Sequence, residues 1–272
     1  MSEAAVPAPR RSSFYTAMRV LPREKREAMY EIYNFCRAVD DIADDAARPR
    51  ADRHVALQAW RDDIDKLYAG SVPERLASLA KAIRDYDLKR ENFLAIIDGM
   101  DMDVATDIRA PDRATFDIYC DRVACAVGRL STQVFGLDEK TGAALADHLG
   151  RALQVTNILR DLDEDAGFGR LYLPRDALDR AGIASSDPQA VLADPALDIA
   201  AQSLVAEART RFEKANEVMA TSSRAKTRAP RLMAIVYRKI LDQVAARGFA
   251  PPRAPVSVSR AGLIFAALRG FF

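Results

Sequence analysis

The sequence has little of what several common kinds of protein require. Its three cysteines, Cys36, Cys120 and Cys125, are odd in number, lack CxxC spacing and have no histidine nearby. This pattern excludes a disulfide framework and a cysteine zinc site, and it predicts a reducing, cytoplasmic compartment. Only two histidines are present, so histidine bases and histidine metal ligands have few candidates.

Net charge is also nearly absent, because 40 basic residues stand against 39 acidic ones. Such a chain has no global field to hold a polyanion, so nucleic acid is not expected as a partner and any anionic ligand needs a local site. No apolar run reaches the length of a membrane span. Residues 1–11 have the composition of a disordered tail and not of a signal peptide.

Glycine and β-branched clusters are scarce, and long segments rich in Ala, Leu, Arg, Asp and Glu predict helix nearly throughout. With 272 residues, of which 49% are hydrophobic, the chain can bury one large core. We therefore expect one all-α domain over residues 12–256, followed by a terminal segment, 257–272. The expected helices span about 22–45, 52–69, 74–85, 90–104, 112–135, 138–166, 197–222 and 228–247.

The stretch YNFCRAVDDIADD carries four aspartates on a helix that also has an apolar face. Tyr33, Arg37, Asp40 and Asp44 share a second face: with Tyr33 at zero, the other three fall at about +40°, −20° and +20°. A solvated acidic face is the usual interpretation of such a run. Here the carboxylates stand in the last turns, where they oppose the negative end of the helix dipole unless a cation offsets them.

The stretch LGRALQVTNILRDLDEDAGFGRLYLP repeats this arrangement on a second long helix. From Gln154, the positions Asn157, Asp161 and Asp165 lie at about −60°, −20° and +20°. Much of the remaining circumference is apolar, which predicts a helix inside the protein whose polar groups need partners. Arg160 falls off this stripe on a straight helix, so geometry alone does not place it at the same site.

Two helices whose aspartates face a common interior would repel each other and protonate unless positive charge lay between them. Carboxylate oxygens four residues apart suit Mg²⁺, which prefers one or two carboxylates together with water and phosphate oxygens. The two stripes therefore predict a site for magnesium ions and a phosphate-bearing ligand.

Other polar residues have simpler interpretations. Asp98, Asp101, Asp103 and Asp107 do not share one helix face, so a solvated helix end is the preferred interpretation of this segment. His54 and His148 stand in polar surroundings and are interpreted as structural or surface residues.

The residues of the two stripes resemble the squalene and phytoene synthase family of head-to-head isoprenyl synthases, and the resemblance covers residues 13–253. The first stretch is similar to the signature YxxCRxxDDxxD and the second to QxxNxxRDxxED; SFY, at residues 13–15, and GRLYLP, at residues 169–174, match as well. Within the family, the residues of these stretches are most similar to those of the bacterial presqualene diphosphate synthases of hopanoid biosynthesis.

The resemblance implies an isoprenoid synthase fold, a single-domain helical bundle around a central cavity. The implied activity is the head-to-head condensation of two farnesyl diphosphate molecules to presqualene diphosphate, with release of diphosphate, for squalene and hopanoid synthesis. Phytoene synthase, acting on two geranylgeranyl diphosphates, and squalene or dehydrosqualene synthase are alternatives within the family. A helical scaffold without turnover is the alternative outside it.

The resemblance also assigns roles to residues. Two or three Mg²⁺ ions are expected on Asp40, Asp44, Asn157, Asp161 and Asp165. Catalytic roles are implied for Tyr33, Arg37, Tyr119, Arg160 and Tyr237. Substrate contacts are implied for Ser13, Phe14, Arg37, Gln154, Asn157, Arg160, Tyr172 and Arg253. The base stays open between the released diphosphate and a tyrosine hydroxyl. NADPH is not expected, since no dinucleotide fingerprint is present, although helical synthases bind NADPH without one.

The final stretch SRAGLIFAALRGFF, from Ser259, is short, apolar and flanked by arginines. It fits either a last helix packed on the core or shallow contact with the surface of the inner membrane. Peripheral membrane contact and downstream squalene-forming enzymes therefore join farnesyl diphosphate as expected partners.

Overall fold

The structure of the protein, a computed structural model, describes residues 18–256. Within this range the chain forms helices and no strand, and an isolated bridge between Arg109 and Leu171 is the one extended pairing. The all-α prediction is therefore confirmed. The expected tail, residues 1–11, and the terminal segment, 257–272, lie outside the described residues.

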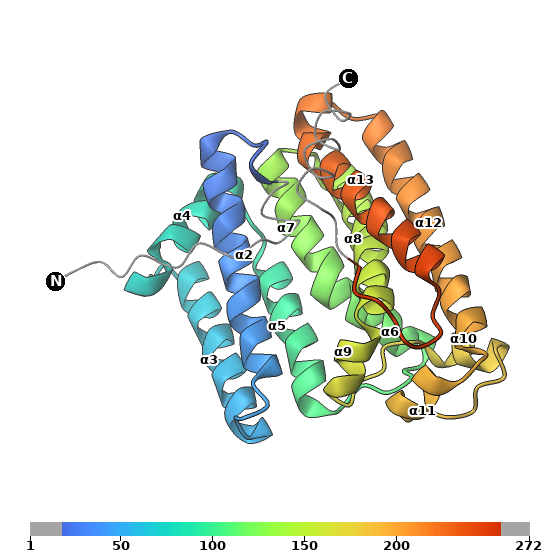
Figure 1. The fold of residues 1–272 in the computed structure, drawn as a ribbon. Coiled ribbons are helices and arrows are strands. Elements are labelled where there is room, and N and C mark those ends of the chain that lie inside the picture. Colours follow the sequence, from blue (N-terminus) through green and yellow to red (C-terminus); the bar gives the residue numbers. More distant parts are fainter. Residues whose placement is uncertain (1–17, 257–272) are drawn as a thin grey trace.

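The helices form two groups that lie side by side (Figure 1). The first group contains α2 (Arg23–Asp44), α3 (Arg50–Tyr68), the short turn η1 (Glu74–Leu76), α4 (Ala77–Tyr86) and α5 (Arg90–Ala105). The second contains α6 (Arg113–Cys120), the π-helical turn η2 (Asp121–Cys125), α7 (Ala126–Phe135), α8 (Glu139–Arg160), α12 (Leu197–Ala220) and α13 (Arg224–Arg247). Three short helices, α9 (Leu162–Gly167), α10 (Arg175–Arg180) and α11 (Pro188–Ala193), lie near the lower end in Figure 1.

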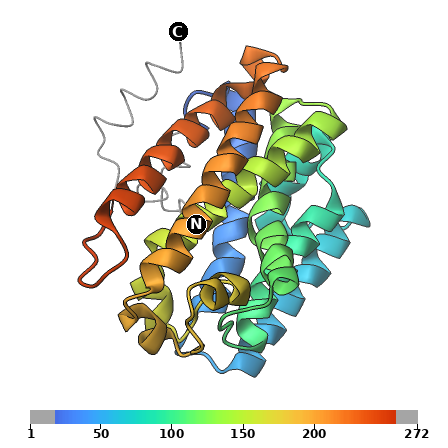
Figure 2. The same cartoon turned by 90° about the vertical axis from the view of Figure 1, so that its right-hand side faces the viewer.

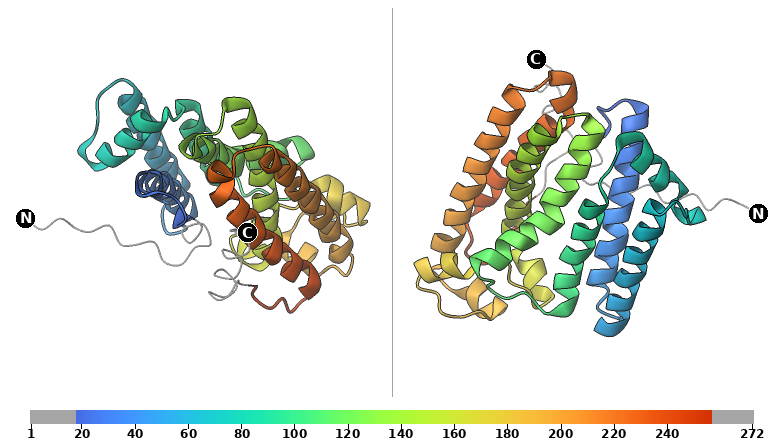
Figure 3. Two further views of the ribbon diagram at one scale, coloured as in Figure 1. Left: turned by 90° about the horizontal axis from the view of Figure 1, so that it is seen from above. Right: turned by 180° about the vertical axis from the view of Figure 1, so that it is seen from behind.

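The long helix α8 stands at the centre of the second group. It packs against α7, η2, α12 and α13, and the views in Figures 2 and 3 show α12 and α13 covering its outer side. The helices α2, α8 and α13 all begin at the upper end in Figure 1 and run downward. The bundle therefore has an end that holds the starts of these three helices and an end that holds their C-terminal turns.

Local sequence signals account for the helix boundaries. Asp112 and Asp138 cap the starts of α6 and α8, where their carboxylates accept hydrogen bonds from the backbone N–H of Thr115, at 2.7 Å, and of Thr141, at 3.0 Å. Gly136 ends α7 at φ 81°, a left-handed conformation that glycine adopts without steric cost.

The predicted helices agree with the structure in most places. The helix expected at 228–247 begins at Arg224, and the one expected at 74–85 starts with a 3₁₀ turn, η1. The expected helix 138–166 is interrupted at Asp161, which has φ −101° and ψ 16°, so α8 and α9 are separate helices. The expected helix 112–135 contains the π-helical turn η2. The helices α10 and α11 were not expected, because six residues are fewer than two turns and show no clear periodicity.

The apolar stripe of α2 forms part of the core, as predicted. Ile32, Phe35 and Val39 are at most 2% exposed. The Phe35 ring meets those of Phe93 and Trp60 edge-on, with centroids 5.1 and 5.5 Å apart. Burial of aromatic side chains of this size makes a large contribution to stability. It also holds α2 at a defined rotation, which decides where its polar face points.

Across residues 18–256 the structure contains no helix with the length and apolar character needed to cross a bilayer.

Candidate active site

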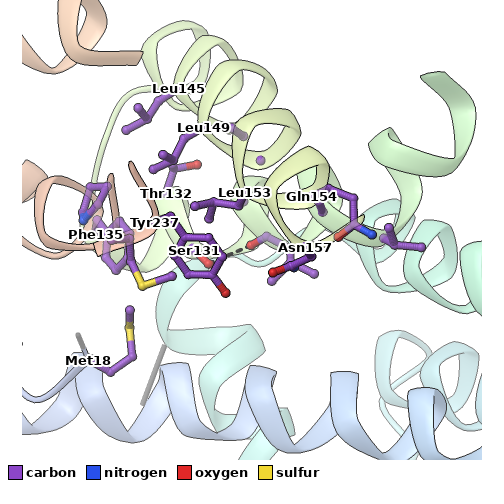
Figure 4. A pocket seen from close by; sticks show the side chains of 18 residues that line it. Met18, Ser131, Thr132, Phe135, Leu145, Leu149, Leu153, Gln154, Asn157 and Tyr237 are labelled. Atoms are coloured by element: carbon purple, nitrogen blue, oxygen red, sulfur yellow. Dashed lines mark hydrogen bonds between the residues drawn. The ribbon is translucent and has the colours of Figure 1, made fainter. Parts of the chain in front are cut away.

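A cavity of about 180 Å³ lies between α7, α8 and α13 (Figure 4). Its walls are mostly apolar, with Met18 and Phe135 toward one end and Asn157 and Tyr237 toward the other. From Leu145 to Asn157 the cavity follows twelve residues of α8, a length of about 18 Å at 1.5 Å per residue. A lining that runs along α8 and is mostly apolar suits a hydrocarbon chain better than a polar metabolite.

Polar side chains gather where the cavity meets the C-terminal part of α8. Gln154 and Asn157 line it there, with Tyr237 of α13 opposite. Burial raises the pKa of the Tyr237 hydroxyl, and the neighbouring Arg160 and Asn157 side chains partly oppose this shift. The side-chain oxygen Oδ1 of Asn157 is buried and has no hydrogen-bond partner among the described residues. A buried acceptor without a partner is unfavourable, so this oxygen is available to a ligand or a metal ion.

The first acidic stripe lies in the second half of α2, where Arg37 forms ion pairs with Asp40 and with its neighbour Asp41. Arg37 donates from Nη1 to Asp40, at 2.6 Å, and from Nη2 to Asp41, at 2.5 Å. Burial, together with the nearby charge of Asp44, raises the pKa of Asp40 to about 6. Tyr33, on the same helix, is half-buried. The charge of Arg37 lowers the pKa of Asp40, but not enough to offset burial and the neighbouring carboxylates.

The second acidic stripe differs from the straight-helix prediction at Asp161. Arg160 donates from Nε, at 2.7 Å, and from Nη2, at 2.5 Å, to the two oxygens of Asp161. Straight-helix geometry did not place Arg160 at this site; in the structure the helix is interrupted at Asp161 and the two side chains are paired. Burial, together with the charge of Asp161, raises the pKa of Asp165 to about 8.

Asp103 on α5 was interpreted as part of a solvated helix end, and the structure contradicts this. Its side chain is buried. It accepts hydrogen bonds from the hydroxyls of Tyr172, at 2.7 Å, and Tyr119, at 3.2 Å. The two tyrosine rings stack with centroids 4.7 Å apart and an interplanar angle of 17°. Burial raises the pKa of Asp103 to about 6, and its charge in turn raises the pKa of Asp40 and of Asp165.

The sequence did contain a signal for Asp103. It follows Ile96 and Met100 at helical spacing, and both are core residues, so Asp103 lies on the apolar face of α5. A carboxylate on such a face is buried and needs partners. The other acidic residues of this segment are surface residues, as expected: Asp98 and Asp101 pair with Arg61, and Asp107 pairs with Arg50.

Arg170, in the segment after α9, was also not singled out from the sequence. It is buried and donates to the Asp44 carboxylate, at 2.7 Å, and to the backbone oxygen of Ala43. Its charge lowers the pKa of both Asp103 and Asp165. Arg170 therefore connects the end of α2 to the carboxylates of α5 and α9.

We refer to five carboxylates together as the acidic site: Asp40, Asp44, Asp103, Asp161 and Asp165. Three arginines form ion pairs with them, namely Arg37 with Asp40, Arg170 with Asp44 and Arg160 with Asp161. Within residues 18–256, Asp103 and Asp165 form no salt bridge. Burial is the main reason for the raised pKa values of Asp40, Asp103 and Asp165, and the charges of neighbouring carboxylates, which the arginines do not fully offset, add to it.

Magnesium fits this donor set. In the described part of the chain, no three Asp, Glu, His or Cys side chains converge closely enough to enclose a metal ion. Mg²⁺ does not require such an enclosure, since it retains waters and accepts phosphate oxygens beside one or two carboxylates. The unpaired Oδ1 of Asn157 and the raised pKa values of Asp40 and Asp165 both indicate a place where a divalent cation would be stabilised.

The remaining predicted residues have other positions. Ser13 and Phe14 lie outside the described residues. Arg253 donates to the Asp163 carboxylate at 2.6 Å and to the backbone oxygens of Phe249 and Leu192, and its side chain is 3% exposed. In this conformation its guanidinium fastens the segment after α13 to α9 and α11.

Both histidines lie away from the acidic site. His54 is exposed and bonds to Asp101, and His148 contacts Arg211 and Asp147 on the outer side of α8. The interpretation of both as structural or surface residues is confirmed.

Comparisons with known proteins agree with this geometry. The family model described as squalene/phytoene synthase matches residues 8–261. A presqualene diphosphate synthase of Rhodopseudomonas palustris is 57% identical over 253 residues, which is 93% of this chain and 90% of that protein. Among solved structures, a dehydrosqualene synthase in complex with ligand superposes with a TM-score of 0.82 at 26% identity, covering 95% of this chain and 90% of the other. The squalene synthase HpnC from Alicyclobacillus acidocaldarius superposes with a TM-score of 0.79 at 29% identity, covering 88% and 89%.

Proposed function

The chain belongs to the squalene and phytoene synthase family, and from this membership we propose that it condenses two farnesyl diphosphate molecules head to head to presqualene diphosphate. The observation that carries the proposal is the 57% identity to a presqualene diphosphate synthase over nine tenths of both chains. The enzyme is then a prenyltransferase that releases one diphosphate per turnover and supplies the squalene and hopanoid pathway.

The acidic site is the place for the diphosphates in this proposal. Enzymes of this family depend on Mg²⁺ in general, and two or three ions here would be held by Asp40, Asp44, Asn157, Asp161 and Asp165. Ions held by these residues would supply positive charge beside the diphosphate as it departs. Arg37 and Arg160 contribute guanidinium groups beside these carboxylates and stabilise the charge of the departing diphosphate once a substrate draws them away from their aspartates.

The reaction begins when the allylic C–O bond of one substrate breaks and its diphosphate leaves. The double bond of the second substrate then attacks the carbocation, and loss of a proton closes the cyclopropane ring. The apolar walls of the cavity exclude water, which would otherwise capture the cation. The faces of Tyr33, Tyr119 and Tyr237 provide aromatic surfaces that favour a cation nearby.

Asp103 acts in this scheme as a positioning residue. It receives the hydroxyls of Tyr119 and Tyr172 and so keeps their stacked rings in one orientation. Burial raises the pKa of both tyrosines, so their hydroxyls are neutral near pH 7. A neutral phenol is a weak base, and we therefore favour the released diphosphate as the acceptor of the proton.

The remaining expectations complete the proposal. Residues 12–256 form the catalytic domain, with Ser13, Phe14, Gln154, Tyr172 and Arg253 as further substrate contacts. The three free cysteines favour the cytoplasm. The segment 257–272 makes peripheral contact with the inner membrane, where downstream squalene-forming enzymes take up the product.

Product analysis by mass spectrometry tests the activity. Purified protein is incubated with Mg²⁺ and either farnesyl or geranylgeranyl diphosphate, with and without NADPH. We expect presqualene diphosphate from the C15 substrate, no reduction to squalene when NADPH is added, and no turnover without Mg²⁺. Phytoene from the C20 substrate would replace the proposal by phytoene synthase. Absence of diphosphate release from either substrate by folded protein would favour a scaffold.

A further inference from the structure

A buried polar atom without a partner lies at the end of α13. It belongs to Arg247, the last residue of that helix. The Arg247 guanidinium donates from Nη1 to the backbone oxygen of Ala254, at 3.0 Å, and from Nε to that of Gly248, at 3.3 Å. Its remaining nitrogen, Nη2, is buried and has no hydrogen-bond partner among residues 18–256. An unpaired buried donor is unfavourable, so Nη2 is available to a ligand.

The neighbouring guanidinium, that of Arg253, is engaged through every nitrogen. Its Nε donates to the backbone oxygen of Phe249, its Nη1 to the Asp163 carboxylate and its Nη2 to the backbone oxygen of Leu192. These contacts hold the segment after α13 in place. Arg247, by contrast, retains a nitrogen without a partner in the described part of the chain.

Arg247 lies near the acidic site. The chain after α13 folds back toward α9 (Figure 1), where Arg253 pairs with Asp163. The charges of Asp163 and of Asp161, a member of the acidic site, both act on the Arg247 guanidinium. The unpaired nitrogen is therefore within electrostatic range of a carboxylate that is proposed to hold magnesium.

The charge of Arg247 is not balanced by a carboxylate. Burial and the positive charge of Arg253 lower the pKa of the Arg247 guanidinium, and the charges of Asp163 and Asp161 do not fully offset them. Both of these carboxylates are engaged, Asp163 with Arg253 and Asp161 with Arg160. Across residues 18–256 Arg247 itself forms no ion pair. An additional anion beside Arg247 would therefore be stabilised.

The surroundings indicate the kind of anion. A ligand that occupies both the acidic site and Nη2 of Arg247 must present oxygens to metal ions and to a guanidinium at the same time. A carboxylate has only two oxygens and a single charge, whereas a diphosphate has several oxygens and more than one negative charge. Arginine also matches phosphate groups well, because its planar N–H groups bind their oxygens. A diphosphate therefore fits this position better than a carboxylate.

We propose that Arg247 binds a phosphate group of a diphosphate held at the acidic site, through the nitrogen that has no partner among the described residues. The identity of the ligand as a diphosphate rests on the proposed function, while the unpaired donor and the unbalanced charge do not depend on it. The contact adds a residue from the C-terminal end of α13 to the substrate contacts proposed above. A prenyl diphosphate and inorganic pyrophosphate both carry the group that Arg247 would bind.

Isothermal titration calorimetry of the full chain with inorganic pyrophosphate, in the presence of Mg²⁺, tests the proposal. Loss of a hydrogen bond to a charged group weakens binding by roughly tenfold to a hundredfold, and Arg247→Gln should show this loss. Arg247→Lys keeps the positive charge but not the planar N–H groups, so it should lose affinity by a smaller factor. The KM for farnesyl diphosphate should rise in parallel if the substrate makes the contact, and it should stay unchanged if only the released pyrophosphate does.

Arg231 provides a matched control near the other end of the same helix. It is half-buried and forms no ion pair within residues 18–256. Its guanidinium donates to the hydroxyl of Thr227, at 3.0 Å, and to the backbone oxygen of Met219. Arg231→Gln removes a comparable arginine far from the acidic site and should leave pyrophosphate binding within about twofold of the unaltered protein.

Three results would overturn the proposal: no binding of pyrophosphate by the folded, unaltered protein, unchanged affinity in Arg247→Gln, or equal loss in Arg231→Gln. A role of Arg247 in fastening the segment alone would lower the melting temperature of Arg247→Gln and leave the affinity unchanged. If Arg247→Gln does not fold, full affinity in Arg247→Lys overturns the proposal instead. Diphosphate release from farnesyl diphosphate reports on the proposed function separately, because a protein without turnover can still bind pyrophosphate through Arg247.

Discussion

The acidic site gathers carboxylates from the ends of α2, α5 and α8 and from α9. The opposite end of the bundle carries Arg224, Lys226 and Arg228 in the first turns of α13 and Lys25 on α2, which together we call the basic face. At the ends of α2, α5 and α8 and at the start of α13 the charges have the sign that the helix dipole disfavours. The difference is burial. At the acidic site the pKa of Asp40, Asp103 and Asp165 is raised to between about 6 and about 8, while at the basic face the residues of α13 are exposed.

This difference in burial distinguishes two kinds of binding site for charged ligands. Buried charges of one sign are costly, so they require a ligand of defined geometry, such as a metal ion with a diphosphate. Exposed charges of one sign are partly screened by water and salt, so they suit an extended surface without defined geometry. The predictions below test whether the two ends differ in this way.

The largest effect is expected from Asp165→Asn at the acidic site. The change removes a proposed metal ligand, and kcat should fall by about 10² to 10³-fold in a diphosphate-release assay. Because the Asp165 carboxyl is largely protonated near pH 7 in the metal-free protein, the neutral amide should leave the melting temperature unchanged or raise it. Asp179→Asn, at an exposed ion pair with Arg175, is the control and should retain full activity. If Asp165→Asn lost activity and also melted at a lower temperature than the unaltered protein, the prediction would be contradicted.

The next effect is expected from removing a hydroxyl that bonds to Asp103. Tyr172→Phe deletes the shorter bond, of 2.7 Å, and should lower the free energy of unfolding by about 1–3 kcal/mol, since a buried acceptor loses its partner. Tyr119→Phe deletes the longer bond, of 3.2 Å, and should cost less. Urea denaturation measures both, with Tyr86→Phe as a half-buried control. A larger loss of stability in Tyr119→Phe than in Tyr172→Phe would contradict the role proposed for the hydrogen bonds to Asp103.

A smaller effect is expected from pH. In the folded protein the pKa of Asp165 is raised to about 8, against about 4 in the unfolded chain. Between these values the folded state keeps a proton that the unfolded state has lost, so this stability is fully present below about pH 4 and is lost as the pH rises to about 8. Solvent screening reduces the effect to the order of 1 kcal/mol, or roughly 2–4 °C in melting temperature.

Thermal melts of the metal-free protein between pH 6 and pH 8 measure this loss. The Asp165→Asn variant should lack most of the pH dependence. Addition of Mg²⁺ with inorganic pyrophosphate should stabilise the unaltered protein more at pH 8 than at pH 6, because the ligand favours the ionised carboxylate. The same pH slope in both proteins would show that another group titrates.

The smallest effect is expected at the basic face. Lys226→Gln removes a charge that lowers the pKa of Lys25, so the stability should rise by no more than about 0.5 kcal/mol and kcat should not change. Lys66→Gln, which removes an exposed ion pair with Asp63, should lower stability by a similarly small amount. A large loss of stability in Lys226→Gln would show that the basic face is structural and would abolish the contrast with the acidic site.

Periodicity was sufficient to predict most of the fold and part of the acidic site. The polar stripe of α2 could be placed because that helix is regular from Arg23 to Asp44. The relation of Arg160 to Asp161 could not, because helical angles accumulate only along an uninterrupted helix and Asp161 leaves the helical conformation. Asp103 was missed because its acidic neighbours on α5 face the solvent and suggested a shared environment.

By itself, the sequence determined that the chain is helical and that two helices carry carboxylates on one face, because these properties depend on spacing within one element. Only the tertiary structure decided that Asp103, Tyr119, Tyr172 and Arg170 join the acidic site and that Lys25 meets Lys226. Contacts of this kind depend on how distant helices pack, and the rotation of each helix against its neighbours is decided by the whole core and not by any one segment.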